Sequence, residues 1–190
     1  MIGNAIAGLY GVGVAPSTTA YESIATTTVG SGGSSTITFS SIPSTFTHLQ
    51  IRAFMKQAGT PTDIEYLIAT FNSSSTGYSY HNLRGDGSSV VANGAGSQTN
   101  APIGVTSPSS NSSYANMFGV AIIDILDYAN TNKYKTVRTL GGMDGNGSGN
   151  INLNSDSWQN TAAINRIDLT SQSFNFVQYS HFALYGIKGA

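Results

Sequence analysis

Alternating apolar and polar side chains are the main regular feature of this chain. Between residues 36 and 40, Ile37 and Phe39 alternate with threonine and serine. A break follows at Pro43, and the same period of two returns in residues 48–53. A period of two is typical of a half-buried β-strand, and proline interrupts it because proline fixes φ and lacks a backbone N–H. The pattern therefore predicts a strand, a turn and a second strand.

The end of the chain repeats the second of these strands. The letters F-T-H-L-Q-I of residues 46–51 have a counterpart in Y-S-H-F-A-L of residues 179–184. Two similar strands, one near each end of the chain, indicate a pair of core strands. We expect this pair to close an all-β sandwich.

Similar patterns predict further strands. The most apolar run, residues 116–126, is typical of a strand covered on both faces, and residues 133–140 alternate as its hairpin partner. Residues 93–108 are interpreted as a loop because Gly, Ser, Thr, Asn and Pro dominate them, and residues 141–150 as a glycine loop. The other expected strands are residues 21–29, in a hairpin with the central stretch, and residues 64–72, 164–170 and 181–187.

The expected fold class is an all-β antiparallel β-sandwich of about eight strands, best matched by a jelly roll. Composition agrees, because 22 glycines and abundant Ser, Thr and Asn disfavour long helices. A hydrophobic content of 39% with a net charge of −1 argues against disorder. We expect a single sandwich domain, residues 17–190, preceded by an extended arm, residues 1–16.

The arm, M-I-G-N-A-I-A-G-L-Y-G-V-G-V-A-P, is apolar but divided by four glycines, which disfavour a helix. Its apolar side chains would promote aggregation if nothing covered them. Two interpretations stay open: an irregular lead-in packed on its own domain, or an attachment arm docked onto another subunit or a larger assembly. The candidate contact residues of the arm are Ile2, Ile6, Leu9, Tyr10, Val12 and Val14.

Low charge and the absence of cysteine exclude several classes of function. Charged residues form 9% of the chain, against about 25% in an average soluble domain. No basic cluster is available for nucleic acid, and disulfides and thiolate metal sites are excluded. No apolar run approaches the ~20 residues that span a bilayer, so we expect no membrane partner. The arm lacks the basic start of a signal peptide, so we expect synthesis in a cytoplasm without export by that route.

The candidate catalytic residues have simpler structural explanations. His48 and His181 stand at matching places beside the expected core strands, where structural hydrogen bonds are the usual role. Asp124 and Asp127 suggest a carboxylate pair, but a strand end and a turn explain them better. No G-x-S-x-G motif is present. We therefore expect no enzymatic activity, no catalytic residue and no cofactor.

The segment Asp144–Asn150, D-G-N-G-S-G-N, resembles a calcium-binding loop because oxygen-bearing side chains alternate with glycine. An EF-hand loop needs a bidentate Glu at its twelfth position, which counted from Asp144 is Ser155. A hairpin loop is therefore the favoured interpretation, and we expect no metal site. Whether these residues bind an ion is a question that the sequence leaves open.

Tyrosines are the most suggestive binding residues. A tyrosine in a loop of Ser, Asn and Gly presents a large contact area at low entropic cost, and so suits a glycan or a protein partner. The candidate surface contacts are Tyr78, Tyr80 and Tyr114. The simpler alternative is that they are strand-end tyrosines that cap the sandwich.

Three blocks of sequence carry a resemblance to a known group. They are M-I-G-N-A-I-A-G-L-Y-G-V-G-V followed by Y-E-S-I, then S-S-I-P-S-T-F-T-H-L-Q-I-R, and finally the segments D-I-L-D-Y-A-N-T-N-K-Y-K-T-V-R, W-Q-N-T-A-A-I-N-R-I-D-L and F-A-L-Y-G-I-K. In these blocks the chain resembles small structural proteins of tailed bacteriophages, especially marine and freshwater phages. The resemblance implies a jelly-roll-like module that assembles as a trimer on a capsid or at a fibre tip.

The resemblance implies a virion structural protein on the particle surface, made in the host cytoplasm, whereas composition indicates only a non-catalytic all-β protein with an apolar arm. A capsid decoration (cement) protein is favoured, with itself as a homotrimer and the major capsid protein or another virion protein as partners. The alternative is the receptor-binding head of a tail or head fibre or spike, which would contact a host-surface glycan or protein. A carbohydrate-active enzyme is the least supported interpretation, because no constellation of catalytic carboxylates is evident.

Overall fold

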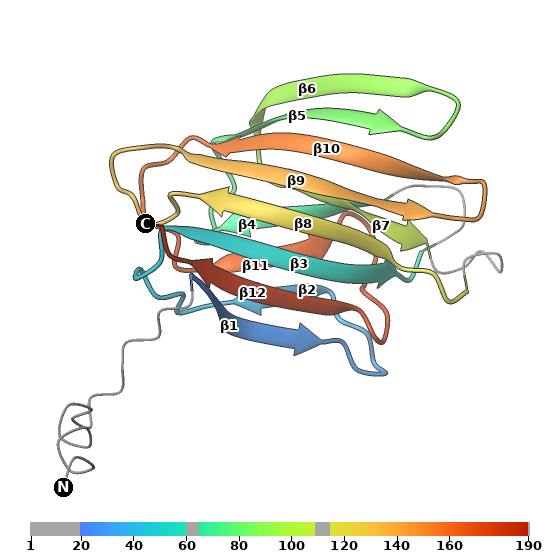
Figure 1. Ribbon diagram of the computed structural model, residues 1–190, viewed down its shortest axis with the longest axis horizontal. Helices are drawn as coiled ribbons and strands as arrows, with labels where there is room; N and C mark the ends of the chain where they lie inside the picture. The colour runs from blue at the N-terminus through green and yellow to red at the C-terminus, as the bar shows by residue number, and fades with distance from the viewer. Residues whose placement is uncertain (1–19, 60–64, 109–114, 190) are drawn as a thin grey trace, which may run out of the picture.

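The computed structural model describes residues 20–59, 65–108 and 115–189 (Figure 1). These residues form β-strands joined by turns and contain no helix. The twelve strands in this part of the chain are β1 (Tyr21–Thr28), β2 (Thr36–Phe39), β3 (His48–Gln57), β4 (Glu65–Phe71), β5 (Tyr78–Gly85), β6 (Val90–Gln98), β7 (Ala101–Pro108), β8 (Gly119–Leu126), β9 (Lys135–Asp144), β10 (Gly149–Trp158), β11 (Ile167–Ser171) and β12 (His181–Ile187).

Two antiparallel sheets pack face to face as a sandwich, so the expected fold class is confirmed. The larger sheet has eight strands in the order β1-β12-β3-β8-β9-β10-β5-β6, and the smaller has β2-β11-β4-β7. The ends of β3 and β7 pair in parallel and link the sheets at one corner. The sandwich therefore contains more strands than the eight of a jelly roll.

The two similar strands near the ends of the chain are neighbours. Strand β3 pairs antiparallel with β12 from His48 opposite Ile187 to Phe54 opposite His181. The hairpin of β8 and β9 is also present. The first pairing was expected from the similarity of the two sequences and the second from an apolar run followed by an alternating one, and both are confirmed.

The expected hairpin between residues 21–29 and the central stretch is wrong. Strand β1 pairs with β12, and β2 pairs with β11. The glycine turn after β1, closed by a hydrogen bond from Gly33 N to Gly30 O, carries the chain from the larger sheet to the smaller one. The consecutive strands β1 and β2 consequently belong to different sheets.

The expected loop over residues 93–108 is also wrong, because most of it lies in β6 and β7. Strand β6 is the edge of the larger sheet, and both of its faces are largely exposed, so burial imposed no alternation on its sequence. The expected glycine loop over residues 141–150 is mostly strand, since β9 and β10 stay paired to Asp144 opposite Gly149. Backbone hydrogen bonds form these ladders without help from an apolar pattern.

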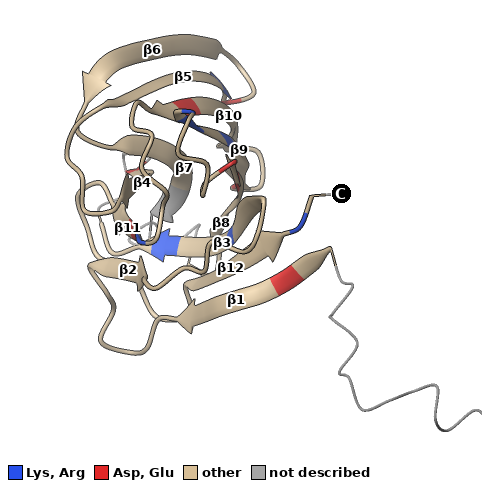
Figure 2. Ribbon diagram, turned by 90° about the vertical axis from the view of Figure 1, so that its left-hand side faces the viewer, with Lys and Arg blue, Asp and Glu red and all other residues tan. Residues whose placement is uncertain are grey.

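The core lies between the sheets and is built from aliphatic and aromatic side chains. Its largest group is Trp158 with Tyr78 and Phe71, whose ring centroids are 5.7–6.2 Å apart. Charged residues are few and scattered over the sandwich, and β6 and β7 have none (Figure 2). Contacts between apolar side chains, rather than ion pairs, therefore dominate the packing.

Strand β10 inverts the usual arrangement of a sandwich strand. Apart from Trp158 at its end, its buried inward side chains are polar, and its outward side chains include Ile151 and Leu153. In most sandwich strands the apolar face is turned toward the core, since that burial stabilises the fold. The inward polar residues are Asn150, Asn152, Asn154 and Asp156.

Candidate interaction surface

An apolar band crosses the outer face of the larger sheet. In one rung Phe54 lies opposite Val120, and Gly142 joins Val120 to Ile151. The next rung runs from Ile122 through Leu140 to Leu153 and Leu83. Each apolar side chain of the band is 44% to 62% exposed: Phe54, Leu83, Val120, Ile122, Leu140, Ile151 and Leu153.

The expectation that residues 116–126 form a strand covered on both faces is wrong for the single chain. The smaller sheet packs against one face of β8 only, and Val120 and Ile122 of the other face belong to the apolar band. The apolar content of β8 therefore exceeds what the fold buries.

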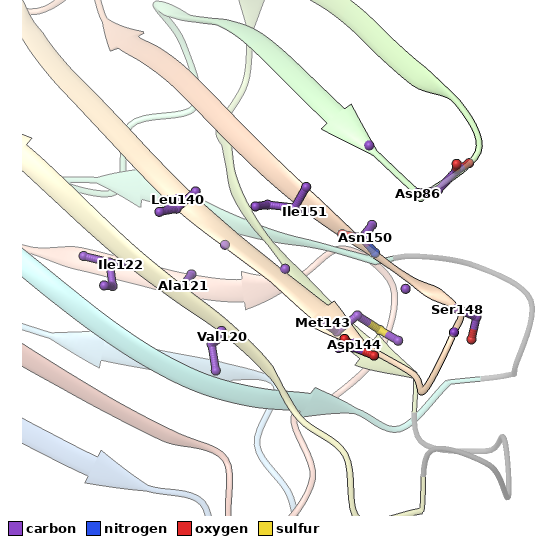
Figure 3. Close-up of a pocket in the computed structure, with 16 residues that line it drawn as sticks. Asp86, Val120, Ala121, Ile122, Leu140, Met143, Asp144, Ser148, Asn150 and Ile151 are labelled. Carbon is purple, nitrogen blue, oxygen red and sulfur yellow. The ribbon is translucent and has the colours of Figure 1, made fainter.

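A groove of about 700 Å³ opens within the apolar band (Figure 3). Val120 and Ile122 line it from β8, and Ile151 lines it from β10. Between them Gly142 of β9 contributes no side chain, so the floor of the groove is backbone. A Cβ at this position would overlap the carbonyl oxygen of Asn150, so the sheet geometry itself requires glycine here.

A polar network borders the apolar band on the same face. Gln50 Nε2 donates to Asp124 Oδ1 at 2.8 Å, and Gln50 Oε1 accepts from the Tyr21 hydroxyl at 2.6 Å and from Arg52 Nε at 3.2 Å. The Arg52 guanidinium also lies over the Tyr21 ring. An apolar centre with a polar rim is the usual composition of a protein interface. Asp124 thus belongs to this rim, as an acceptor from a glutamine amide.

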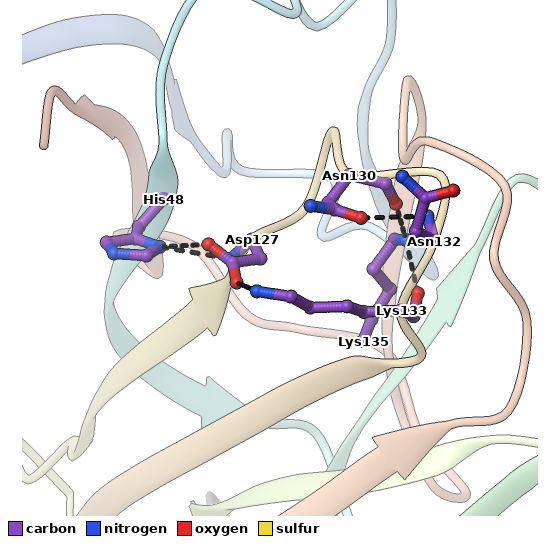
Figure 4. Close-up of polar contacts among 6 residues, drawn as sticks. All are labelled: His48, Asp127, Asn130, Asn132, Lys133 and Lys135. Atoms are coloured by element: carbon purple, nitrogen blue, oxygen red, sulfur yellow. Dashed lines mark hydrogen bonds and ion pairs between the residues drawn. The ribbon is translucent and has the colours of Figure 1, made fainter.

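Asp127 forms a second polar cluster at the start of β3 (Figure 4). Its carboxylate accepts a hydrogen bond from Lys133 Nζ at 2.7 Å, which lowers the pKa of Asp127. Its backbone N–H donates to His48 Nδ1 at 3.0 Å. Because that nitrogen accepts, the 3.7 Å approach of the carboxylate to it is not a charge pair. The expected structural hydrogen bond of His48 is confirmed, and so is that of His181, which pairs with Thr28 Oγ1 at 2.9 Å.

The segment 144–150 contains a tight hairpin turn. Asn146 and Gly147 both have positive φ, and Asp144 Oδ1 accepts from Asn146 N at 2.8 Å. Paired positive φ values suit the two-residue turns that match the twist of a hairpin. The hairpin interpretation is confirmed. In the part of the chain that the structure describes, no group of three or more His, Asp or Glu side chains is placed to hold a metal ion.

The structure separates the three candidate tyrosines. The expectation that Tyr78 is a surface contact is wrong: β5 begins there with its side chain inward, and the ring is fully buried against Phe71 and Trp158. Tyr80 is partly exposed and lines a smaller hollow between the sheets. Tyr114 lies outside the described residues, as do the arm residues Ile2, Ile6, Leu9, Tyr10, Val12 and Val14.

The apolar band is the surface feature that the sequence interpretation missed. The signal was present in residues 151–154, I-N-L-N, where apolar and polar residues alternate. Alternation shows that a strand has two unlike faces, but it does not say which face meets the core. Here the polar face does.

Comparisons with protein-family models, with curated proteins and with solved structures found no match to this chain. Within the described ranges no helix is long and apolar enough to cross a membrane. Function is therefore inferred from the surface of the sandwich and from the resemblance of the three sequence blocks.

Proposed function

We propose that this chain is a non-enzymatic structural protein of a bacteriophage virion, and specifically a capsid decoration protein on the particle surface. The observation that carries the proposal is the inverted strand β10, which turns Ile151 and Leu153 to the outside and asparagines to the inside. A surface of this kind is typical of a subunit that is covered by other subunits. The assignment to a bacteriophage rests on the sequence resemblance alone.

A second copy of the same chain is the proposed occupant of the apolar band. The chain has a net charge of −1, so copies repel one another little. The side chains of the band are neutral and are flanked by the hydrogen-bonded rim of Gln50 and Asp124. With the three-fold symmetry that the resemblance implies, the assembly would be a homotrimer.

The free energy gained by burying the apolar band decides whether the band alone can hold two copies of the chain together. Full burial of a large apolar side chain contributes roughly 1.5–3 kcal/mol, so each half-exposed member of the band has about 1 kcal/mol left to gain. Seven such side chains would give roughly 7 kcal/mol, which is within the ~4–15 kcal/mol that association costs in lost freedom. The band therefore supports a weak contact that needs a second one.

The arm, residues 1–16, is the proposed second contact, with the major capsid protein or another virion protein as its partner. Its apolar residues are separated by glycines, so an extended segment could follow an irregular groove. Three arms on one trimer would raise the overall affinity by avidity without any strong single contact. The arm precedes β1, an edge strand of the larger sheet.

Oligomeric state tests the role of the apolar band. Light scattering at micromolar concentration should give a trimer for the wild type and a monomer for Ile151→Lys, since burying the ammonium group would be costly. Ser155→Lys is the matched control, because it adds the same charge on the outward face of the same strand but outside the band. The proposal would be contradicted if the wild type were a monomer, or if the wild type and both variants were all trimers.

Binding to the particle tests the arm. Deleting residues 1–14 should leave a folded sandwich that no longer decorates virions. If the truncated protein still decorates virions at normal occupancy, the arm is not the attachment segment and only leads into the sandwich.

A cryo-EM map of the virion would locate the subunit. Density at a fibre tip instead of the capsid lattice would favour the second candidate function, a receptor-binding head. The hollow beside Tyr80 is the observation that favours this candidate.

A further inference from the structure

A hollow of about 310 Å³ lies where β5 of the larger sheet faces β4 and β11 of the smaller one. Each of these strands contributes to its lining, with Tyr80 and Asn82 from β5, Tyr66 from β4 and Thr170 from β11. Gln172, just beyond β11, lies at its rim. The hollow is thus lined from both sheets of the sandwich.

The chemistry of the lining selects the class of ligand. Two tyrosine rings offer flat apolar faces, and amide and hydroxyl groups offer both donors and acceptors. None of the described residues that line the hollow carries a charge. An ionic ligand would therefore lose hydration without gaining a counter-charge from the lining, and the neighbouring Arg84 guanidinium already donates to the Tyr66 hydroxyl. A sugar ring fits, because its C–H face packs on an aromatic ring while its hydroxyl groups pair with amides.

Two residues, Arg84 and Asn82, prepare the hollow for a ligand. Arg84 Nη1 donates to the Tyr66 hydroxyl at 3.4 Å, which orients that ring from outside the lining. Asn82 is only 7% exposed, and its Oδ1 has no hydrogen-bond partner among the described residues. A buried carbonyl oxygen left unpaired costs roughly 1–3 kcal/mol, which a ligand hydroxyl that donates to it would recover. Such a group is a ready partner for a hydroxyl.

We propose that this hollow binds a single neutral sugar residue, such as the end of a glycan. Its volume lies at the lower end of the ~300–1,000 Å³ typical of small-molecule sites, so it suits one ring rather than an oligosaccharide. Tyr80 provides the stacking face, and Asn82, Thr170 and Gln172 pair with hydroxyl groups. The site does not depend on trimer formation or on the arm.

Titration of the full chain with methyl glycosides of neutral hexoses and of N-acetylhexosamines, followed by amide NMR, tests the site. At least one should bind with a Kd of about 1 mM or tighter, which corresponds to roughly 4 kcal/mol, and should shift the amide signals of Asn82 and Gln172. A uronic acid should not bind. Absence of saturable shifts with every neutral glycoside, or equal binding of the uronic acid, would overturn the proposal.

Substitutions in the lining test whether the glycoside binds in this hollow. Tyr80→Ala should weaken the affinity at least tenfold, and Gln172→Ala, which changes an exposed rim residue, should weaken it severalfold with the fold intact. Tyr134→Ala is the matched control, because Tyr134 is an exposed tyrosine outside the hollow. Unchanged binding in Gln172→Ala and Tyr80→Ala, or an equal loss in the control, would overturn the assignment. Glycoside binding is measured by NMR, whereas trimer formation and virion binding are measured in other experiments. The sugar site and the decoration role can therefore fail independently.

Discussion

Val120 and Ile151 lie on opposite sides of Gly142 in one rung of the larger sheet. The groove between them exists because the central residue of the rung has no side chain. Alanine at this position would place a methyl group against the Asn150 carbonyl oxygen.

We therefore expect Gly142→Ala to lower the free energy of unfolding by roughly 1–3 kcal/mol, as other overpacked sites do. Urea denaturation measures this loss. Gly96→Ala in β6 is the matched control and should be nearly neutral, because a Cβ there meets no atom within 4 Å. Equal midpoints for the two variants would show that β9 tolerates a side chain beside Val120.

Tyr78→Phe tests the structural role of that tyrosine. Its hydroxyl accepts from the backbone N–H of Phe71 at 2.8 Å, and burial raises the pKa of Tyr78 to about 12. Removing the hydroxyl leaves a buried N–H unpaired, which should cost roughly 1–3 kcal/mol of stability. Tyr80→Phe should cost far less, since its ring is partly exposed. Thermal unfolding of both variants distinguishes them, and a stable Tyr78→Phe would refute this role.

Lys135 is a buried cation bound by backbone carbonyls. Its Nζ donates to the carbonyl oxygens of Asn130, of Lys133 at 3.0 Å and of Thr161 at 3.2 Å, and burial lowers the pKa of the ammonium group. Lys135→Met keeps the stem but leaves these carbonyls without their donor, so we expect a loss of roughly 1–3 kcal/mol.

Lys133→Met is the control for Lys135→Met. It removes an exposed ion pair with Asp127, and exposed pairs contribute only about 0–1 kcal/mol. Chemical denaturation of both variants gives the comparison. A larger loss at Lys133 than at Lys135 would mean that the surface pair, not the buried ammonium, joins the turn after β8 to the loop at Thr161.

Asp156 should make stability fall as the pH rises. Burial raises the pKa of this carboxyl from 3.8 to about 8, and nearby Arg138 only partly opposes the shift. Between these values the folded state keeps a proton that the unfolded state releases, so stability decreases through this window by up to about 1.4 kcal/mol per pH unit. Asp156→Asn is neutral at every pH and should flatten the dependence. Unfolding curves from about pH 5 to pH 8 test this, and an unchanged slope would assign the effect to other groups.

The local sequence was enough to predict two kinds of element: strands with a strong alternating or apolar pattern, and turns between strands that are close in the chain. The period of two in residues 48–53 located β3, and the similar residues 179–184 indicated its partner β12. The turn between β8 and β9 and the Asn146-Gly147 turn were also predictable, because the positive φ at Asp127, Asn146 and Gly147 is a local steric preference of Asp, Asn and Gly.

Only the tertiary structure decided which strands became neighbours and which faces turned inward. Strand β1 pairs with β12 although more than a hundred residues separate them, and β6 forms on backbone hydrogen bonds without any apolar pattern. In β10 the alternation was visible, but the packing turned Asn152 inward and Ile151 outward. The hollow between Tyr66 and Tyr80 likewise needs both sheets in place. Alternation sets two unlike faces on a strand, whereas the free energy of the whole packed assembly selects the face that is buried.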